Sequence, residues 1–531
     1  MIHNIEGAVA LLAAVAALAL LARRVPMIPF PIVLVLGGLL LGLIPGLPRF
    51  VLSPDLVFLF FLPPLLYPAA LFTPWRDFRA NARPIGMLAV GLVLFTTLAV
   101  GFLAQYLLPD FTLAAGIVLG AIISPPDAIA ANAIAERLHL PRRIVTILEG
   151  ESLVNDATAL VLYRFGVATI VTGQFSLSHA GGRFLVVGLG GILLGLAVGM
   201  ATGWVIKLLD DPPIEITLSL LTPFAAYLLC ERLEVSGVLA VVTAGLYHGW
   251  RAPEFTTSRM RLQAAPVWQM LEFILNGFVF LLIGLQLPEV TRGLGGNSPG
   301  TLVWYALVIS VAVIAIRIIW VIPAAYLPRL LSRRIRERDP LPPWQHIAIV
   351  GWAGIRGVVS LAAAMALPLE NGNGSPFPGR NLILFLTFVV ILVTLVVQGL
   401  SLPLLIRKLG VVDDGAAELE ERTARLKANE AALARVNELD AAQAISSDVI
   451  NRMRVEYQDR IRQLQVCEPD QDASSSHLYS TEFERLARET LQVERKTLLQ
   501  LRNENVINDQ VLRRVQRDID LAEVRLFRRE G

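Results

Sequence analysis

The chain has 531 residues, of which 55% are hydrophobic and 17% are charged, and its formal net charge at pH 7 is +2. Charged residues are scarce in long stretches before residue 410, which is typical of membrane proteins rather than soluble globular ones. Nothing in this composition indicates a nucleic-acid-binding protein. Of the two cysteines, Cys230 lies in an apolar stretch and Cys467 in a polar tail, so no disulfide is expected.

Apolar stretches long enough to cross a bilayer recur along the first 410 residues. A crossing helix needs about 20 mostly apolar residues, and this length predicts thirteen spans. The first is interpreted as a retained span rather than a signal peptide, because no basic segment precedes it and Arg23-Arg24 is a poor cleavage site. The approximate extents are 5 to 22, 27 to 46, 55 to 72, 83 to 108, 112 to 135, 141 to 170, 184 to 208, 213 to 231, 235 to 250, 267 to 288, 301 to 328, 344 to 369 and 381 to 407.

Basic residues gather in alternate loops between these spans. One set of loops holds seventeen Lys and Arg residues, and the other set holds five, namely Arg49, Arg183, Arg232, Arg292 and Arg380. Because Lys and Arg are retained on the cytoplasmic side, the asymmetry predicts a multi-pass protein of the bacterial inner membrane. Its N-terminus would lie outside and its C-terminus in the cytoplasm.

The fifth predicted span is interrupted by Pro125 and Pro126, which are followed directly by Asp127. Proline removes a backbone donor and breaks a helix, and a broken helix at membrane depth is tolerated where it lines a polar cavity. An aspartate inside a span is a candidate functional residue. Asp127 is therefore either a member of an ion site or the cap of the following half-helix, and the two roles are compatible.

The sixth span carries the densest polar cluster within any span, residues 149 to 156. Helical spacing puts Ser152 on one face with Asn155 and Asp156. A carboxylate, a hydroxyl and an amide offer oxygen ligands to a hard cation that has lost part of its water. Glu151 lies five residues before Asp156, about 140° away around the helix, so the two need not share one role.

Two arginines fall inside apolar spans and need partners there. Arg356 lies between glycines in the twelfth span, and a segment-six carboxylate is its simplest partner. We expect Glu151 to pair with Arg356, which leaves Asp156 free for ions. Arg317 in the eleventh span is either a second functional residue or a side chain that snorkels to the cytoplasmic interface.

Other polar residues in or near the spans are interpreted as helix contacts or interface residues. His248 has a side chain that titrates near neutral pH, but its position alone does not make it a sensor. This group comprises Glu272, Asn276, Gln286, Tyr247 and His248.

Three motifs together resemble the sodium/proton exchangers of the first monovalent cation:proton antiporter family. They are the break at 124 to 128, the run at 149 to 156 and the element at 354 to 357, in that order along the chain. The resemblance covers about residues 5 to 410. It implies an all-α fold of two inverted repeats, with a dimerisation domain, a mobile core domain and two broken helices that cross near the midplane. It also implies a homodimer.

The same resemblance implies roles for individual residues. Asp156 would be the main cation and proton ligand, and Asn155 a structural neighbour in place of a second aspartate. Ser152 would supply a side-chain ligand, Asp127 a further acidic group and Pro126 a backbone carbonyl, while Glu151 would pair with Arg356. The chain departs from the pattern at Pro126, where many members have threonine, and at Pro68, where some have glutamate.

These residues predict a secondary active antiporter that exchanges Na⁺ for H⁺ by alternating access. If Asp156 binds either a proton or a cation but not both, exchange follows from competition, and one such carboxylate predicts electroneutral transport. K⁺ or Li⁺ in place of Na⁺ stays open, as does a cation channel or ion-coupled symporter. No nucleophile with a base and no metal triad is seen, so neither an enzyme nor a cofactor is expected.

After residue 410 the composition becomes charged and rich in Ala and Leu, which predicts a cytosolic helical tail over 411–531. Residues 468 to 480 resemble a linker between two helices, the second running from about 481 to 529. The tail is either a solvated helical hairpin or a dimerising coiled coil.

Overall fold

Helices form every regular element in the residues that the computed structural model describes, and the one β feature there is an isolated bridge between Glu370 and Pro376. The chain divides into two units, Met1–Asp413 and Asp414–Gly531. The described residues are 2–24, 28–44, 57–109, 111–127, 131, 134–135, 138, 140–172, 177–292, 298–371, 374–413, 415–442 and 445–465, with scattered residues between 486 and 521.

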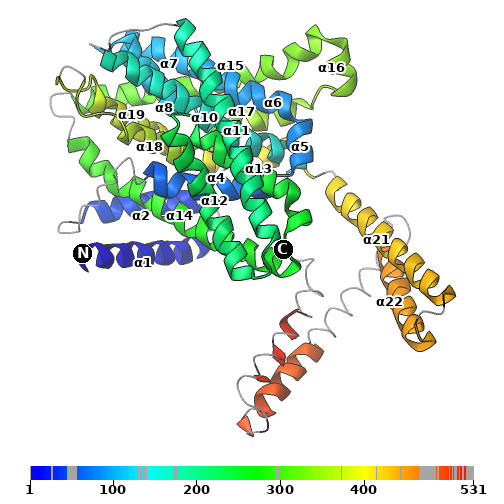
Figure 1. The fold of residues 1–531 in the computed structure, drawn as a ribbon. Helices are drawn as coiled ribbons and strands as arrows, with labels where there is room; N and C mark the ends of the chain where they lie inside the picture. The colour runs from blue at the N-terminus through cyan, green and yellow to red at the C-terminus, as the bar shows by residue number, and fades with distance from the viewer. Residues whose placement is uncertain are drawn as a thin grey trace. The chain divides into compact units, whose positions relative to one another are not determined.

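Figure 1 shows the helices of the first unit in chain order. In its first half they are α1 (Ile2–Arg24), α2 (Phe30–Gly42), η1 (Val57–Phe61), α4 (Leu62–Phe72), α5 (Trp75–Ala80), α6 (Ala82–Gly86), η2 (Met87–Leu92), α7 (Val93–Leu107), α8 (Leu113–Ile123) and α10 (Arg142–Thr172). In its second half they are α11 (Leu177–Lys207), α12 (Pro212–Arg232), α13 (Gly237–Phe255), α14 (Ser258–Arg292), α15 (Pro299–Leu331), α16 (Arg333–Arg338), α17 (Trp344–Trp352), α18 (Val358–Met365), α19 (Arg380–Val393), η3 (Thr394–Gln398) and α20 (Gly399–Leu409).

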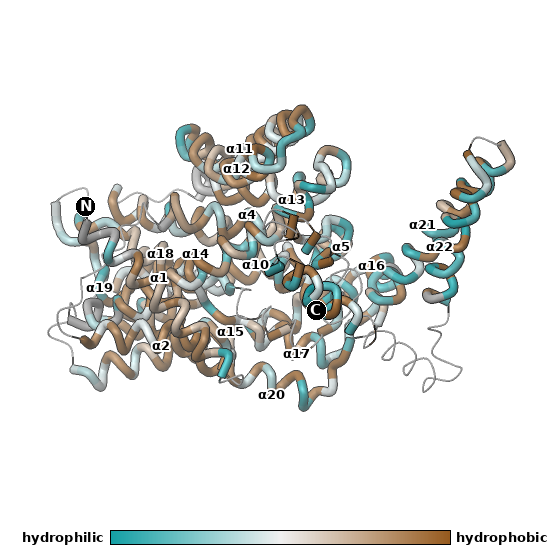
Figure 2. Tube along the Cα trace, turned by 90° about the horizontal axis from the view of Figure 1, so that it is seen from below, coloured by the Kyte–Doolittle hydropathy of each residue, from teal (hydrophilic) through white to brown (hydrophobic). Residues whose placement is uncertain are grey.

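Seven helices in the described residues are long and apolar enough to cross a membrane. They include the continuous runs Ala82–Leu107 and Arg380–Leu409, in each of which a π-helical turn is inserted. Figure 2 shows the hydrophobic residues that dominate these helices and the more hydrophilic α21 (Ala416–Ala441) and α22 (Ser447–Gln465) of the second unit. The all-helical polytopic fold predicted from the sequence is confirmed, while the total of thirteen spans stays a prediction.

The first unit contains two groups of packed helices. In one group α2 packs on α14, and α13 packs on α4, α11 and α12. In the other, α8 packs on α7 and α10, and α15 packs on α7, α17 and α19. The α2–α14 pair is packed backbone to backbone, because a Cβ at Gly38 or Gly284 would overlap the facing helix's carbonyl oxygens. Small residues at a helix contact permit this approach in membranes.

Two helices are interrupted, and their interruptions meet. The α-helix α8 ends at Ile123 before an irregular stretch at 124–127, as Pro125 and Pro126 predicted. The second interruption, residues 353–357, separates α17 from α18. The Asp127 N–H donates to the Ile355 carbonyl at 2.7 Å, which joins the two breaks directly. The predicted capping of a following half-helix by Asp127 falls on residues 128–130, which lie outside the described part of the chain.

A charge cluster around Asp339 ties together several helix ends. Arg143, at the start of α10, donates to the Asp339 carboxylate at 2.6 Å, and Arg329, near the end of α15, donates at 2.8 Å. Arg83 of α6 also pairs with this carboxylate. Burial would raise the pKa of Asp339, but hydrogen bonds and charges from Arg143 and Arg329 outweigh it, so this pKa lies below its usual value.

The second unit contains an antiparallel pair of helices, α21 and α22. Arg422 near the start of α21 donates to the Leu464 carbonyl at 2.7 Å, and Arg454 of α22 donates to the Asp440 carboxylate at 2.5 Å. The chain therefore reverses direction between the end of α21 and the start of α22, well before the predicted linker. That linker, residues 468 to 480, lies outside the described residues, and the single helix expected ahead of it is corrected to two.

Candidate functional site

The polar cluster of the sixth predicted span lies in the middle of α10, which runs without interruption from Arg142 to Thr172. Asn155 is fully buried and Asp156 is 5% exposed, while Ser152 is half-buried on the same helix. An ionisable group held at such depth is costly unless it binds a proton, a cation or a partner. Asp156 is therefore a candidate for binding a proton or a cation.

Asn155 connects α10 to the interruption after α8. Its amide Nδ2 donates to the Pro126 carbonyl at 2.9 Å. Its Oδ1 is buried and has no hydrogen-bond partner in the described residues. A buried acceptor without a partner costs about 1–3 kcal/mol, so this oxygen is suited to a ligand that is not part of the chain. Asn155 thus links α10 to the interruption after α8, and its side-chain oxygen is available to a ligand next to Asp156.

Asp127 lies at the point where the two interruptions meet. Its carboxylate approaches Gly357 so closely that a Cβ at that position would overlap Oδ2. Only glycine fits there without displacing the carboxylate. The stretch after α8, the helix α10 and the 353–357 interruption therefore bring Asp127, Asn155 and Asp156 to one region of the structure. That they form one ion site stays a prediction.

Glu151 is paired with Arg317, so the predicted partner Arg356 is wrong. The Arg317 guanidinium donates through Nη1 to Oε1 at 2.5 Å and through Nη2 to Oε2 at 2.8 Å. Both side chains are at most 1% exposed, and the Arg317 Nε also donates to the Val350 carbonyl. Snorkelling of Arg317 to the interface is therefore also ruled out. A bidentate pair of this kind satisfies both charges at once.

Arg356 instead donates hydrogen bonds to backbone carbonyls at the two helix interruptions. It is 1% exposed, and its Nε donates to the carbonyl of Ile123, the last residue of α8, at 2.9 Å. Its Nη1 donates to the Gly354 carbonyl, and the backbone N–H of Arg356 donates to the Thr394 Oγ1 at 3.1 Å. A cation at a helix C-terminus compensates carbonyls that have lost their intrahelical partners. Thr394 drew no attention in the sequence, because threonine is common in spans.

His248 lies between α4, α11 and α13. Its Nδ1 contacts the Tyr67 hydroxyl at 2.5 Å, and its Nε2 contacts the Gly199 carbonyl at 2.8 Å and the Thr202 Oγ1 at 3.1 Å. All its ring nitrogens are thus engaged in contacts between helices, which is the role expected for this group of polar residues. Within the described residues no group of three His, Cys, Asp or Glu side chains is arranged to hold a metal ion.

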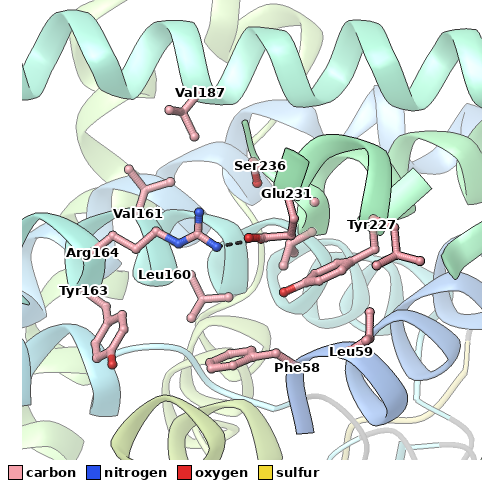
Figure 3. Close-up of a pocket in the computed structure, with 13 residues that line it drawn as sticks. Phe58, Leu59, Leu160, Val161, Tyr163, Arg164, Val187, Tyr227, Glu231 and Ser236 are labelled. Carbon is pink, nitrogen blue, oxygen red and sulfur yellow. Dashed lines mark hydrogen bonds and ion pairs between the residues drawn. The ribbon is translucent and has the colours of Figure 1, made fainter. Parts of the chain in front are cut away.

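Two cavities lie along α10, on either side of Asp156. One, of about 350 Å³, is lined by Arg142, Thr146 and Glu149. The other, of about 380 Å³, is lined by Leu160 and Arg164 of α10 together with residues of α12 and α13 (Figure 3). Positions three and four apart share a helix face, so the stripe that faces both cavities also carries Asp156.

Known proteins match most of this chain. The family model described as "Sodium/hydrogen exchanger, transmembrane" matches residues 9–408. An uncharacterized Na⁺/H⁺ exchanger of Mycobacterium tuberculosis is 39% identical over 525 residues, which is 98% of this chain and 95% of the relative. A sodium, potassium, lithium and rubidium/H⁺ antiporter of Bacillus pumilus is 35% identical over 411 residues, 75% of this chain and 60% of the relative.

A solved structure has the same fold. The sodium proton antiporter MjNhaP1 from Methanocaldococcus jannaschii matches with a TM-score of 0.59 at 19% identity, over 77% of this chain and 99% of that one. At this identity the likeness concerns the arrangement of helices alone.

Proposed function

Because the chain belongs to the sodium/hydrogen exchanger family, we propose that it is a secondary active antiporter that exchanges Na⁺ for H⁺ across the bacterial inner membrane by alternating access. The observation that carries this proposal is the position of Asp156. It is buried on an uninterrupted helix, and its neighbour Asn155 is bonded to the point where two broken helices meet. Broken helices at membrane depth are a common way to build ion sites in secondary transporters.

In this proposal Asp156 is the exchanging carboxylate. It takes either a proton or a cation, and the unoccupied, charged form is disfavoured because desolvation penalises a bare charge. Asp127 and Ser152 supply further oxygen ligands, Asn155 supplies its unpartnered Oδ1, and Pro126 supplies a carbonyl oxygen that has a second lone pair beside the one used by Asn155. The ions are substrates, and the mechanism needs neither a resident cofactor nor a catalytic residue.

We further propose a ratio of one proton to one cation. Glu151 is held in an ion pair with Arg317 and takes no part in the exchange that we propose. The residue before Asp156 is an amide, so it adds no second titrating group. Each half-cycle then carries one positive charge in either direction, and the net reaction moves no charge across the membrane.

The transported cation is the next feature of the proposed exchange. Oxygen ligands of this kind suit Na⁺, K⁺ and Li⁺, and selectivity depends on cavity size and ligand number. The name of the Bacillus pumilus relative includes potassium and lithium beside sodium. We propose Na⁺ as the main substrate, with K⁺ and Li⁺ as the alternatives to be measured.

The topology and assembly are also proposed. The basic residues that gather in alternate loops support an N-terminus outside and a C-terminus in the cytoplasm. A transmembrane exchanger domain over 1–410 and a cytosolic helical tail over 411–531 follow from this orientation. A homodimer is proposed from the family resemblance.

The proposal is tested by dissipation of a pH gradient in everted membrane vesicles, with NaCl, KCl and LiCl added in turn. Addition of Na⁺ is expected to collapse the gradient, and an imposed membrane potential in proteoliposomes is expected to leave the rate unchanged. Voltage-dependent proton flux would refute electroneutral exchange. Cation conduction without proton counter-movement would favour a channel instead.

A further inference from the structure

An ion pair crosses the cavity on the far side of Asp156 from Arg142. Arg164 of α10 donates through Nη2 to the Glu231 Oε1 of α12 at 2.6 Å (Figure 3). The two side chains belong to the two different groups of packed helices described above. Apart from this pair and a few apolar contacts, α10 and α12 touch little, since α10 packs chiefly on α8.

Arg164 lies on the stripe of α10 that leads away from Asp156. Asp156, Leu160 and Arg164 are spaced four residues apart, so they lie on one face. At 1.5 Å per residue, Arg164 is about 12 Å along the axis from Asp156. Leu160 lies between them and lines the same cavity of about 380 Å³. The ion pair therefore lies across this cavity, on the face of α10 that also carries Asp156.

The two helix groups meet in a buried hydrophobic cluster beside this face. Leu153 and Ala157 of α10 belong to that cluster together with Tyr227 and Cys230 of α12 and residues of α4 and α13. In alternating access one group of helices moves against another around a fixed site. A charge pair between the groups at one end favours the conformation in which that end is closed.

We propose that Arg164 and Glu231 form the outer gate of the exchanger, closed when Asp156 is open to the cytoplasm and broken when Asp156 is open to the outside. The pair acts by positioning α10 against α12 and does not itself bind the transported ion. This inference rests on the proposed antiport and on the proposed orientation, in which the end of α10 near Thr172 lies outside.

The gate is tested by the accessibility of a cysteine placed in the cavity behind the ion pair. Leu160→Cys is introduced into a chain in which Cys230 and Cys467 are both changed to Ala, and its reaction with a membrane-impermeant methanethiosulfonate reagent is followed from the outer side. Arg164→Gln is expected to raise the labelling rate about two- to five-fold, the population shift that an exposed ion pair of ordinary strength supports. The charge-swapped pair Arg164→Glu with Glu231→Arg is expected to return the rate to that of the parent.

Arg183→Gln is the matched control. Arg183 pairs with Glu234 at 3.1 Å and both side chains are well exposed, but this pair joins α11 to the turn after α12, within one group of helices. Its loss removes the same charge and is expected to leave labelling unchanged. Equal labelling in Arg164→Gln and Arg183→Gln would overturn the gate, as would faster labelling only from the cytoplasmic side.

The labelling assay needs no transport, so it separates this inference from the proposed function. If the parent exchanges Na⁺ for H⁺ but Arg164→Gln leaves the labelling rate of Leu160→Cys unchanged, the gate is refuted and the proposed antiport stands. If Arg164→Gln raises the labelling rate but the parent shows no Na⁺/H⁺ exchange, the gating role of the ion pair is supported and the proposed function is refuted.

Discussion

Arg317 binds Glu151 through two parallel hydrogen bonds between side chains that are both buried. This pair joins α15 to α10 within both helices. Arg356 is therefore available to donate to the backbone carbonyls at the helix interruptions. The acidic residue nearest in sequence to the candidate ion site is therefore part of the framework that holds α10 in place.

The pairing predicts which substitutions rescue each other. Arg317→Gln leaves a buried carboxylate without its partner and is expected to cost about 3–5 kcal/mol of stability, seen as a lower melting temperature in detergent. Adding Glu151→Gln is expected to recover most of that loss, because two neutral amides replace two charges. The combination of Glu151→Gln with Arg356→Gln is expected to show no such recovery. Recovery in that second combination alone would contradict the observed pairing.

The close approach of Gly357 to Asp127 predicts a strong effect from a single methyl group. Gly357→Ala is expected to lower Na⁺/H⁺ exchange at least ten-fold, because the new Cβ displaces the Asp127 carboxylate. Gly351→Ala, a control on the preceding half-helix, meets its nearest neighbour only at 3.9 Å and is expected to keep near-normal exchange. Both are assayed by pH-gradient dissipation at equal expression. Normal exchange by Gly357→Ala would show that the position of Asp127 is unimportant.

Asn155 is predicted to act through both ends of its amide. Asn155→Leu removes the donor to the Pro126 carbonyl and the free Oδ1, so the KM for Na⁺ is expected to rise about ten-fold or more while the protein stays folded. The matched control is Asn276→Leu, since Asn276 on α14 is also a buried asparagine whose Oδ1 has no hydrogen-bond partner among the described residues. The control is expected to change KM little. Equal effects in the two variants would assign Asn155 a general packing role.

The Asp339 cluster predicts a pH-dependent contribution to stability. Its folded-state pKa is lowered chiefly by Arg143 and Arg329 against the opposing effect of burial, so the ionised carboxylate stabilises the protein above its unfolded pKa of about 3.9 and loses that contribution as the pH falls through the folded value. Asp339→Asn is expected to cost about 1–3 kcal/mol at pH 7 and the difference from wild type is expected to shrink below about pH 4.

The control for this measurement is Asp413→Asn, at an exposed position near the end of the first unit. It is expected to leave the melting temperature unchanged at each pH. A deficit of Asp339→Asn that stays constant from pH 7 to pH 3 would show that the carboxylate's charge is not what stabilises the cluster.

The sequence predicted those features that follow from covalent chemistry and periodicity. Pro125 and Pro126 fixed the break because proline lacks an N–H, and the apolar stretches located the long helices. The partner of Glu151 could not be predicted in this way. Both arginines lie within apolar spans, and the sequence analysis favoured Arg356, whereas the rotation of α15 and the course of the second interruption give the pairing to Arg317. The pairs at Asp339 and at Arg164 join residues from distant helices, so no local pattern reveals them.

Coupled flux in proteoliposomes shows whether Asp156 exchanges a proton for a cation. Radioactive Na⁺ uptake and proton efflux are measured together for wild type, Asp156→Asn and the control Asp413→Asn. Equal numbers of ions and protons are expected in wild type and in Asp413→Asn, and neither flux is expected in an Asp156→Asn protein that is folded and inserted. Coupled exchange retained by Asp156→Asn would refute the role proposed for this carboxylate.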